Sequence, residues 1–414
     1  MKIVHVIGTI DPAGGGPQAV VMRMGAAQAA LGHEVHVVAY GDAESEARAC
    51  KAAAEVPHFT DITRHIVPFP DRIEAVFAGR AGRALQMLIP GSDFIHIHGV
   101  WDAILRRAAA IARIHEIPYC VRPAGMLDSW SMQQKAWKKR LALACGYRSM
   151  LEGAAFIQVL NADEAELMKP LGLRPPCILI PNGVFLEEIE PFRQAGRFRT
   201  SRPQLGQKPF ILFLSRLHHK KGLDLLADAF AKVAVIRPEI DLVVAGPDDG
   251  ARAALVASIN VSGVSERVHV VGPLFGRDKI DALIDAACFC LPSRQEGFSV
   301  AITEALACGC PVVISEACHF PEVRDAGAGA VVPLDTTAIA QALIRILDDP
   351  VTAARMSENG RELVRRRYVW PQIAALTLDA YATHGRRRHS SQGRDGLRAA
   401  VANIGHRQSG ELLE

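Results

Sequence analysis

Short runs of apolar residues alternate along the chain with longer segments in which apolar residues recur every three or four positions. The short runs predict strands buried on both faces of a parallel sheet, and the longer segments predict helices that pack on such a sheet. The predicted strands lie at 2–8, 35–40, 93–101 with its exit, 117–122, 155–160, 177–180, 210–214, 240–245, 267–271, 286–291, 312–315 and 330–332. We therefore expect an α/β chain whose two halves face one another across a cleft.

The stretch at 185–208 is polar, rich in arginine and without periodicity, so we interpret it as the connection between two domains. A last helical pattern runs from Trp370 to Tyr381, and an end rich in Gly, Arg and Ser begins at His384. The predicted units are two domains, a final helix and a basic disordered tail, at 1–185, 186–369, 370–383 and 384–414.

Composition narrows the class of protein. The 414 residues are 49% hydrophobic, enough for large globular cores, and the formal charge of +3 gives no support for nucleic acid as the main partner. Nine cysteines, an odd number, fit a reducing compartment better than a disulfide framework. The N-terminal segment is too short for a signal peptide, and no apolar run reaches the roughly 18 residues of a membrane span. We expect a cytoplasmic protein.

The loop that follows the apolar run ending at Leu291 carries the strongest chemical signal. Residues 297–299 would place free backbone N–H groups at a helix start, where unpaired donors attract phosphate. Glu296, before the helix, and Glu304, on its body, offer carboxylates that accept hydrogen bonds from hydroxyls. A nucleotide sugar carries a phosphate between two hydroxyl-bearing rings and would match these features. The alternative is an ordinary strand–loop–helix unit with two solvated glutamates.

Two other loops suit the same ligand. Arg216 and Lys221 lie at a strand exit and a helix start, where two cations beside helix donors suit a diphosphate, although solvated charge is the alternative. Gly14, Gly15 and Gly16 let the backbone approach a phosphate or sugar closely, but they also fit a flexible loop. No acidic residue closes the second strand as a nicotinamide site would require, which argues against a dehydrogenase.

The third predicted strand carries His96 and His98. With a period of two, they point to the same face near the carboxyl end, where open α/β sheets bind ligands. A metal site would need a third ligand, for which the sequence offers no obvious candidate. They are therefore packed histidines or, for His98 together with Trp101, part of an acceptor pocket.

A basic amphipathic segment lies at 134–150, where lysines and arginines are interleaved with Trp137, Leu141 and Leu143. Such a segment suits an anionic membrane surface or a lipid-linked phosphate, and a solvated helix face is the alternative. On the first interpretation, we expect peripheral contact with the inner face of the plasma membrane.

The loop and helix around Glu296 and Glu304 resemble the E-x7-E motif of glycosyltransferase family 4. Four other pieces that resemble the family occur in its order, at 14–16, 181–184, 215–222 and 309–313. The resemblance covers roughly residues 1–382. Within the family, the loop at 125–128 and the strand exit at 98–101 resemble a subgroup common in bacterial exopolysaccharide and capsule assembly.

This resemblance implies the B-type glycosyltransferase fold. In that fold two Rossmann-like domains face one another across a cleft, the first holds most of the acceptor, the second holds most of the donor, and a final helix crosses back to the first. The resemblance also implies retaining transfer of a hexose from a nucleotide diphosphate sugar to a saccharide, which the subgroup makes lipid-linked. No cofactor or metal is expected, in agreement with the lack of any Asp-x-Asp in the sequence.

The same resemblance assigns roles to residues. Arg216 and Lys221 would hold the diphosphate and offset the charge that develops as it leaves, and Glu296 would accept from hydroxyls of the transferred sugar. We expect these three to be catalytic. The other donor-binding residues would be Gly15, Gly16, Leu274, Gly297, Phe298, Ser299 and Glu304. The acceptor-binding residues would be His98, Trp101, Arg122 and Met126.

The chain departs from the family pattern at Ala124, where many members carry a histidine near the donor sugar. His98 and Arg122 are candidates to compensate. Two other functions stay open, a B-fold epimerase or phosphorylase and a non-catalytic nucleotide-sugar-binding partner of a membrane glycan assembly complex. Ala124 favours the non-catalytic partner, whereas the complete set of Glu296, Glu304, Arg216 and Lys221 opposes it.

Overall fold

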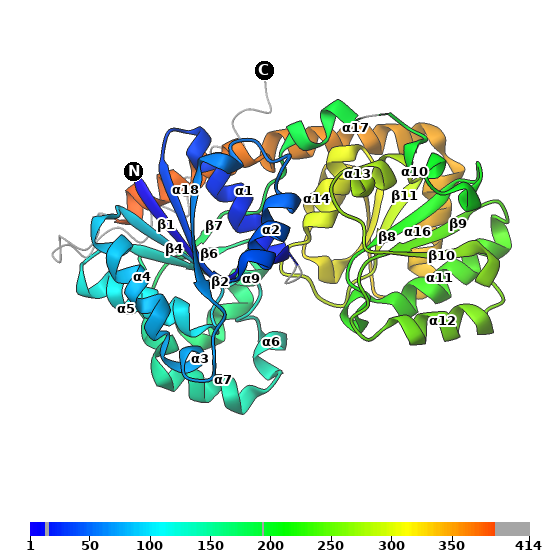
Figure 1. The fold of residues 1–414 in the computed structure, drawn as a ribbon. Coiled ribbons are helices and arrows are strands. Elements are labelled where there is room, and N and C mark those ends of the chain that lie inside the picture. The colour runs from blue at the N-terminus through cyan, green and yellow to red at the C-terminus, as the bar shows by residue number, and fades with distance from the viewer. Residues whose placement is uncertain (13–15, 193, 386–414) are drawn as a thin grey trace, which may run out of the picture.

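The computed structural model describes residues 1–12, 16–192 and 194–385. They contain two β-sheets, each built of parallel strands and covered by helices (Figure 1). The first sheet has seven strands in the order β3-β2-β1-β4-β5-β6-β7. These strands are β1 (Lys2–Thr9), β2 (Glu34–Gly41), β3 (Ile62–Pro68), β4 (Phe94–His98), β5 (Tyr119–Arg122), β6 (Phe156–Val159) and β7 (Cys177–Leu179). All the pairings are parallel, which confirms the predicted α/β architecture.

The second sheet has six strands in the order β10-β9-β8-β11-β12-β13, also parallel. They are β8 (Phe210–Leu214), β9 (Asp241–Ala245), β10 (Val268–Gly272), β11 (Cys288–Leu291), β12 (Val312–Ser315) and β13 (Gly329–Val332). The order reverses between β8 and β11, so the carboxyl ends of these central strands form the crevice in which such sheets bind ligands.

Successive side chains of each strand point to opposite faces of the first sheet, so the core around this sheet has two layers. Ile3 and Ile7 pack with α1 (Gly16–Ala30) and α18 (Trp370–Gly385), whereas Val4 and Val6 pack with helices on the other face. Those other helices include α4 (Gly79–Leu88) and α5 (Ala103–Ile114). A strand buried on both faces needs apolar residues at nearly every position, which explains the continuous runs in the sequence.

Helices also cover the second sheet. The longest of them are α11 (Leu223–Ile236), α16 (Thr336–Asp348) and α17 (Pro350–Arg367). The arginine-rich stretch at 185–208 is more than a connection, because its Phe198 is fully buried and its Leu205 is 2% exposed in this core. Phe198 stands between two arginines, and Leu205 is an isolated apolar residue between Gln204 and Gly206, so no periodicity revealed them.

The final helix returns to the first domain, as the predicted fold class requires (Figure 1). The backbone N–H of Val184 donates to Tyr368 O at 2.8 Å, and Trp370 N–H donates back to Val184 O at 3.1 Å. From there α18 packs against α1, with Trp370 fully buried. The domain boundaries placed at 185 and 369 fall at this crossing and remain predictions.

Two local features differ from the pattern read along the sequence. Strand β3 is an edge strand that the apolar runs did not indicate, because its middle residues are only partly buried. The basic segment at 134–150 is not one helix but α7 (Ala136–Ala142) and α8 (Arg148–Glu152), separated at Gly146, whose φ of 102° interrupts the helical backbone. No helix in the described part of the chain is long and apolar enough to span a bilayer.

Candidate functional site

The loop from Pro292 to Ser299 joins β11 to α14 (Val300–Cys308), at the carboxyl edge of the second sheet. Ser299 occupies the N-cap position, but its own side chain makes no hydrogen bond to the first turn of the helix. The amides of its first turn therefore remain available to an anion, which the positive end of the helix dipole also favours. Gly309 ends the helix in the left-handed conformation, with φ of 77°.

Glu296 and Lys221 form an ion pair beside this helix start. Lys221 Nζ lies 2.6 Å from Glu296 Oε1, and the Ser293 hydroxyl donates to the same oxygen at 2.6 Å. Both charged side chains are largely buried, with 13% exposure for Lys221 and 8% for Glu296. Their approach depends on Gly222, at which a Cβ would lie 2.0 Å from Pro292 O.

The other charged residues implied for the donor are paired within the protein as well. Lys279 Nζ contacts Glu304 Oε1 at 2.5 Å, and Arg216 Nη1 contacts Asp249 Oδ2 at 2.5 Å. Arg216 is 55% exposed, so its pair is open to exchange with a solvent ligand. A diphosphate with two hydroxyl-bearing rings can replace the partners in these pairs. Its phosphates would bind the cations, and its ring hydroxyls would donate to the carboxylates.

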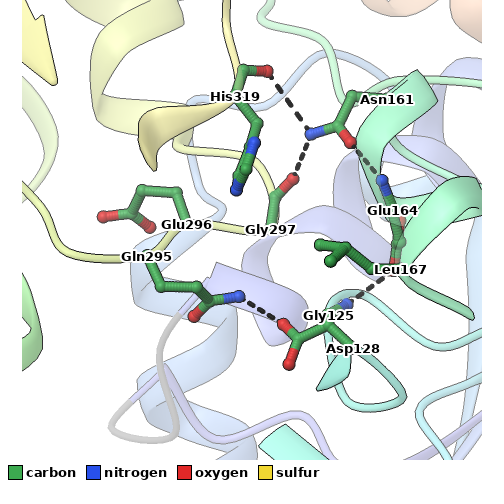
Figure 2. Close-up of a pocket in the computed structure, with 9 residues that line it drawn as sticks. All are labelled: Gly125, Asp128, Asn161, Glu164, Leu167, Gln295, Glu296, Gly297 and His319. Carbon is green, nitrogen blue, oxygen red and sulfur yellow. Dashed lines mark hydrogen bonds between the residues drawn. The ribbon is translucent and has the colours of Figure 1, made fainter. Parts of the chain in front are cut away.

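The loops of the two domains meet at a pair of glycines. A Cβ on Gly125 would lie 3.5 Å from Gly297 Cα, an ordinary van der Waals contact, and the φ of 80° at Gly125 favours glycine there. The Asn161 side-chain amide donates to Gly297 O at 2.7 Å while its Oδ1 accepts from the Glu164 N–H at 2.8 Å (Figure 2). Asn161 therefore both caps a helix of the first domain and holds the 292–299 loop of the second.

A small pocket surrounds this meeting point (Figure 2). Its lining comes from both domains and consists of Gly125, Asp128, Asn161, Glu164, Leu167, Gln295, Glu296, Gly297 and His319. Glu296 and Gly297 were predicted from the sequence, whereas the other side chains were not. Asn161 and Asp128 do carry a local signal, because each is an N-cap residue, but that signal predicts a helix start and not a position in a cleft.

Glu164 shapes the first-domain side of this pocket. Its carboxylate accepts from the Gly125 N–H at 2.6 Å and from the Leu160 N–H at 2.7 Å, and burial raises its pKa. Ala124, the departure from the family pattern, has φ of 52°, an unusual conformation for a residue other than glycine. The carboxylate thus fixes a strained loop next to the 292–299 loop of the second domain.

The remaining predicted residues lie in different surroundings. Leu274 is 6% exposed and packs in the second core, and the Phe298 ring packs at an angle against those of Phe320 and Tyr368. Gly16 is the first residue of α1, and Gly15 lies outside the described residues. Of the four acceptor candidates, Trp101 and Met126 are half-buried, whereas His98 and Arg122 are buried in the sheet, at 2% and 1% exposure, and the four do not line the pocket.

Within the described part of the chain, one side-chain hydrogen bond holds Arg122. Its Nη2 donates to Asn182 Oδ1 at 2.7 Å, and burial lowers its pKa to about 10. Asn182 belongs to the Pro-Asn-Gly-Val turn at 181–184 that leads to the crossing of the chain. This guanidinium therefore joins the end of β5 to that turn.

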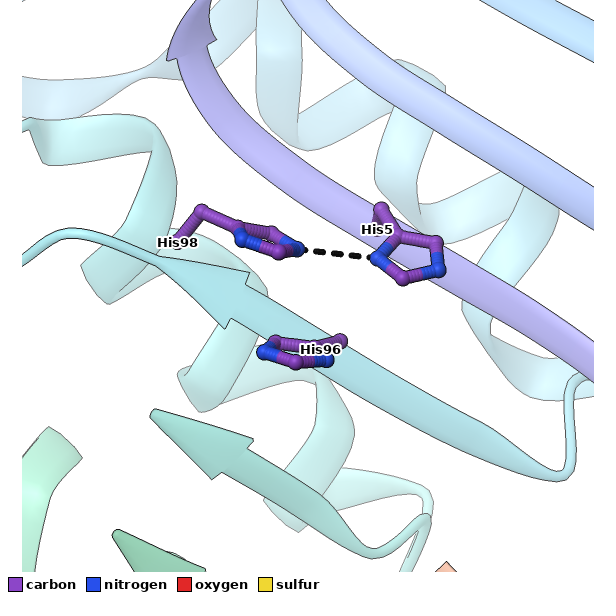
Figure 3. A group of neighbouring side chains, drawn as sticks. All are labelled: His5, His96 and His98. Carbon is purple, nitrogen blue, oxygen red and sulfur yellow. Dashed lines mark hydrogen bonds between the residues drawn. The ribbon is translucent and has the colours of Figure 1, made fainter. Parts of the chain in front are cut away.

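The structure supplies the third histidine that the sequence did not indicate. His5 on β1 lies beside His96 and His98, and its Nδ1 is 2.8 Å from His98 Nε2 (Figure 3). The ring of His5 also bonds Gln28, and His96 bonds the Tyr381 hydroxyl of α18 at 2.6 Å. His96 Nε2 and His98 Nδ1 have no partner among the described residues.

This histidine cluster fits hydrogen bonding better than metal binding. Burial lowers the pKa of all three rings, so they are neutral and able to ligate. However, the Arg122 guanidinium also acts on His96 and His98, and a metal ion would add further positive charge to this buried region. We interpret the cluster as neutral histidines that fasten α18 to the first sheet through Tyr381.

The cluster predicts a loss of stability in acid. Burial lowers the pKa of His5 from 6.5 to about 4, so between these values the unfolded chain binds more protons than the folded chain. Stability therefore falls as pH decreases from 6.5 toward 4, and His5 alone should cost about 2 kcal/mol at pH 5. Urea unfolding at pH 7 and pH 5 should show a smaller loss in His5→Gln than in the wild type. His115→Gln, at the exposed end of α5, should keep the wild-type loss, and equal losses in all three proteins would contradict the prediction.

Two family models match the chain in succession. Residues 15–183 match a family described as "Glycosyl transferase 4-like domain", and residues 197–363 match "Glycosyl transferases group 1". Together they cover every strand of both sheets except β1, which precedes the first match. The boundary between the two matches falls within the arginine-rich stretch that precedes β8.

Curated relatives and solved structures agree with these models. The chain is 30% identical over 230 residues to a phosphatidyl-myo-inositol mannosyltransferase of Mycobacterium leprae, a match that covers 55% of this chain and 59% of the relative. The chain thus spans less than two thirds of that relative's length. Sucrose-phosphate synthase of Thermosynechococcus elongatus has a similar fold, with a TM-score of 0.73 and 21% identity over 92% of this chain and 99% of that one. Anabaena HepE in complex with UDP-glucose gives a TM-score of 0.74 and 18% identity over 92% and 100%.

Proposed function

The chain belongs to the group 1 glycosyl transferases, and we propose that it transfers a hexose from a nucleotide diphosphate sugar to a saccharide acceptor. In this reaction the bond between sugar C1 and the diphosphate oxygen breaks, and a bond from C1 to an acceptor oxygen forms on the same face of the ring. The acceptor hydroxyl gives its proton to the leaving diphosphate. No metal or cofactor takes part in the proposed step.

The observation that carries the proposal is the Lys221–Glu296 pair beside the uncapped start of α14. The helix amides and Lys221 can offset the negative charge that develops on the leaving diphosphate, with Arg216 at the solvent side. Glu296 and Glu304 can accept from hydroxyls of the sugar and the ribose. The similar structure of Anabaena HepE is a complex with UDP-glucose, which supports this class of donor.

Ligand-dependent unfolding of the full chain tests the donor. A ligand that binds only the folded state raises the unfolding midpoint. We expect one of UDP, GDP and ADP, and its hexose conjugate, to raise the midpoint with and without EDTA. The matching nucleoside monophosphate is the control and should have little effect, because it lacks the second phosphate that Lys221 and Arg216 would hold. No shift with any diphosphate would overturn the proposal.

Turnover separates the transferase from the other functions left open by the sequence. Purified protein should release the nucleoside diphosphate and form a new glycoside when a saccharide acceptor is added. Binding without turnover would favour the non-catalytic partner, and conversion of the sugar nucleotide without an acceptor would favour an epimerase. The similar mannosyltransferase of Mycobacterium leprae is named for phosphatidyl-myo-inositol, which is a lipid. This name supports a lipid-linked acceptor in surface polysaccharide synthesis.

A lipid-linked acceptor would bring the protein to the inner membrane surface, and one surface of the first domain suits such contact. Trp137 and Leu141 of α7 are 67% and 57% exposed beside exposed Lys138 and Arg140. We expect co-sedimentation with phosphatidylglycerol vesicles but not with phosphatidylcholine vesicles, and loss of binding when Lys138 and Arg140 become glutamine. Binding that is unaffected by these substitutions would remove the membrane contact from the proposal.

A further inference from the structure

Two side-chain contacts cross the cleft next to the donor site. The Gln295 side-chain amide donates to Asp128, and Lys220 Nζ lies 4.3 Å from the centroid of the Trp130 ring. Gln295 directly precedes Glu296 and Lys220 directly precedes Lys221, so the neighbours of both donor residues contact one loop of the first domain. This segment follows β5 and comprises the loop from Gly125 to Asp128 and the first turn of the short helix that begins at Ser129.

Asp128 is a buried carboxylate beside the donor loop. It is 2% exposed, and one oxygen caps α6 (Ser129–Gln133) by accepting from the Ser131 N–H. The other oxygen, Oδ2, lies 3.7 Å from the point where a Cβ on Gly125 would stand, and Gly297 Cα lies 3.5 Å from that same point. Because the Gln295 amide also donates to Oδ2, this oxygen lies next to the loop that would hold the transferred sugar.

Gln295 has unused hydrogen-bonding capacity at the same place. It is 8% exposed and lines the pocket, yet its Oε1 has no hydrogen-bond partner among the described residues (Figure 2). Such a buried acceptor costs stability unless a donor reaches it. A hydroxyl is a donor of the right size, and a sugar presents several hydroxyls side by side.

Trp130 offers the complementary apolar surface. Its side chain is 43% exposed, although it is large and contacts Lys220 of the other domain. A lysine ammonium over its ring forms a cation–π contact, in which Lys220 occupies the face of the indole. An indole face and a nearby carboxylate are the pair of features that a hydroxylated ring requires, one for its apolar face and one for its hydroxyls.

We propose that Asp128 and Trp130 form a subsite for the acceptor saccharide, in which an acceptor hydroxyl donates to Asp128 Oδ2, a second donates to Gln295 Oε1, and the sugar ring stacks on Trp130. Without acceptor, Gln295 and Lys220 contact these two groups. This inference rests on the proposed transferase function and adds the residues that select the acceptor. It also places the acceptor next to Gly297, because the acceptor hydroxyl must lie close to the transferred sugar.

The test separates acceptor binding from donor binding. The donor is UDP-glucose or GDP-mannose, whichever raises the unfolding midpoint, and the acceptors are octyl glucoside, octyl mannoside and octyl galactoside. Asp128→Asn keeps an oxygen that can cap α6, and Trp130→Phe keeps an aromatic face. Asp128→Asn and Trp130→Ala should raise the acceptor KM at least tenfold while the donor Kd stays within twofold, and Trp130→Phe should recover most of the loss.

Asp335→Asn is the matched control, because Asp335 caps α16 by accepting from the Ala338 N–H as Asp128 caps α6. It should leave both the donor Kd and the acceptor KM unchanged. An acceptor KM within twofold of wild type in Asp128→Asn, or an equal rise in donor Kd, would overturn the subsite, the second by showing that Asp128 serves domain closure. Donor binding without transfer to any glycoside by the wild type would also overturn it. Absence of donor binding would instead refute the proposed function.

Discussion

Lys221→Ala is expected to lower kcat/KM for transfer about 10³-fold, the size of effect seen when one group that stabilises developing negative charge is removed. The reason lies in its position, since Lys221 Nζ lies beside the start of α14 and at 13% exposure is shielded from water. In such surroundings a cation acts on a leaving diphosphate more strongly than at the surface. Steady-state kinetics would measure the loss, and titration with the nucleoside diphosphate should show weaker binding.

Stability needs a separate measurement in this variant. Removing Lys221 leaves the Glu296 carboxylate buried with Ser293 as its remaining side-chain partner, which should cost about 1–3 kcal/mol in free energy of unfolding. Lys232→Ala is the control, because this lysine of the same domain contacts Thr336 and Thr337 on the exposed surface. A Lys221→Ala protein that is folded and retains wild-type turnover would show that the lysine does not act on the leaving group.

The arrangement of the proposed donor residues was predictable because these residues are local in sequence. Glu296, the loop glycine Gly297 and the helix start after Ser299 are contiguous, and their order alone predicts a strand, an anion-binding turn and a helix. Lys221 was predictable for the same reason, as a cation between a strand and a helix. The parallel order of the strands then brings both loops to one sheet edge without further information.

Side chains that meet across the cleft were not predictable in this way. Gln295 and Asp128 are separated by 167 positions, and nothing local to either residue indicates the other. His5 likewise occupies an ordinary position in an apolar strand, and it becomes part of a cluster only because β1 pairs with β4 in the register His5↔His96. Strand register and domain closure are properties of the whole fold. They cannot be predicted from a single sequence whose strand pairing is unknown.

Glu296→Gln is expected to lower kcat about 10²-fold or more, yet to affect diphosphate binding in the direction opposite to Lys221→Ala. In the free protein the Glu296 carboxylate neutralises Lys221 at 2.6 Å, so a diphosphate must displace it before it can pair with the lysine. Glutamine removes that competition, and the nucleoside diphosphate should therefore bind at least as tightly as to the wild type. Turnover falls because a neutral amide accepts hydrogen bonds from the sugar hydroxyls more weakly than a carboxylate does.

The two variants together distinguish competition for Lys221 from simple damage to the site, because damage would weaken diphosphate binding in both. Calorimetric titration with the nucleoside diphosphate and steady-state kinetics on the same preparations supply the two quantities. Glu266→Gln, at an exposed turn of the same domain, should behave as the wild type in both measurements. If Glu296→Gln loses diphosphate affinity in proportion to turnover, then Glu296 acts by holding the site together, and the exchange of the carboxylate for diphosphate on Lys221 is refuted.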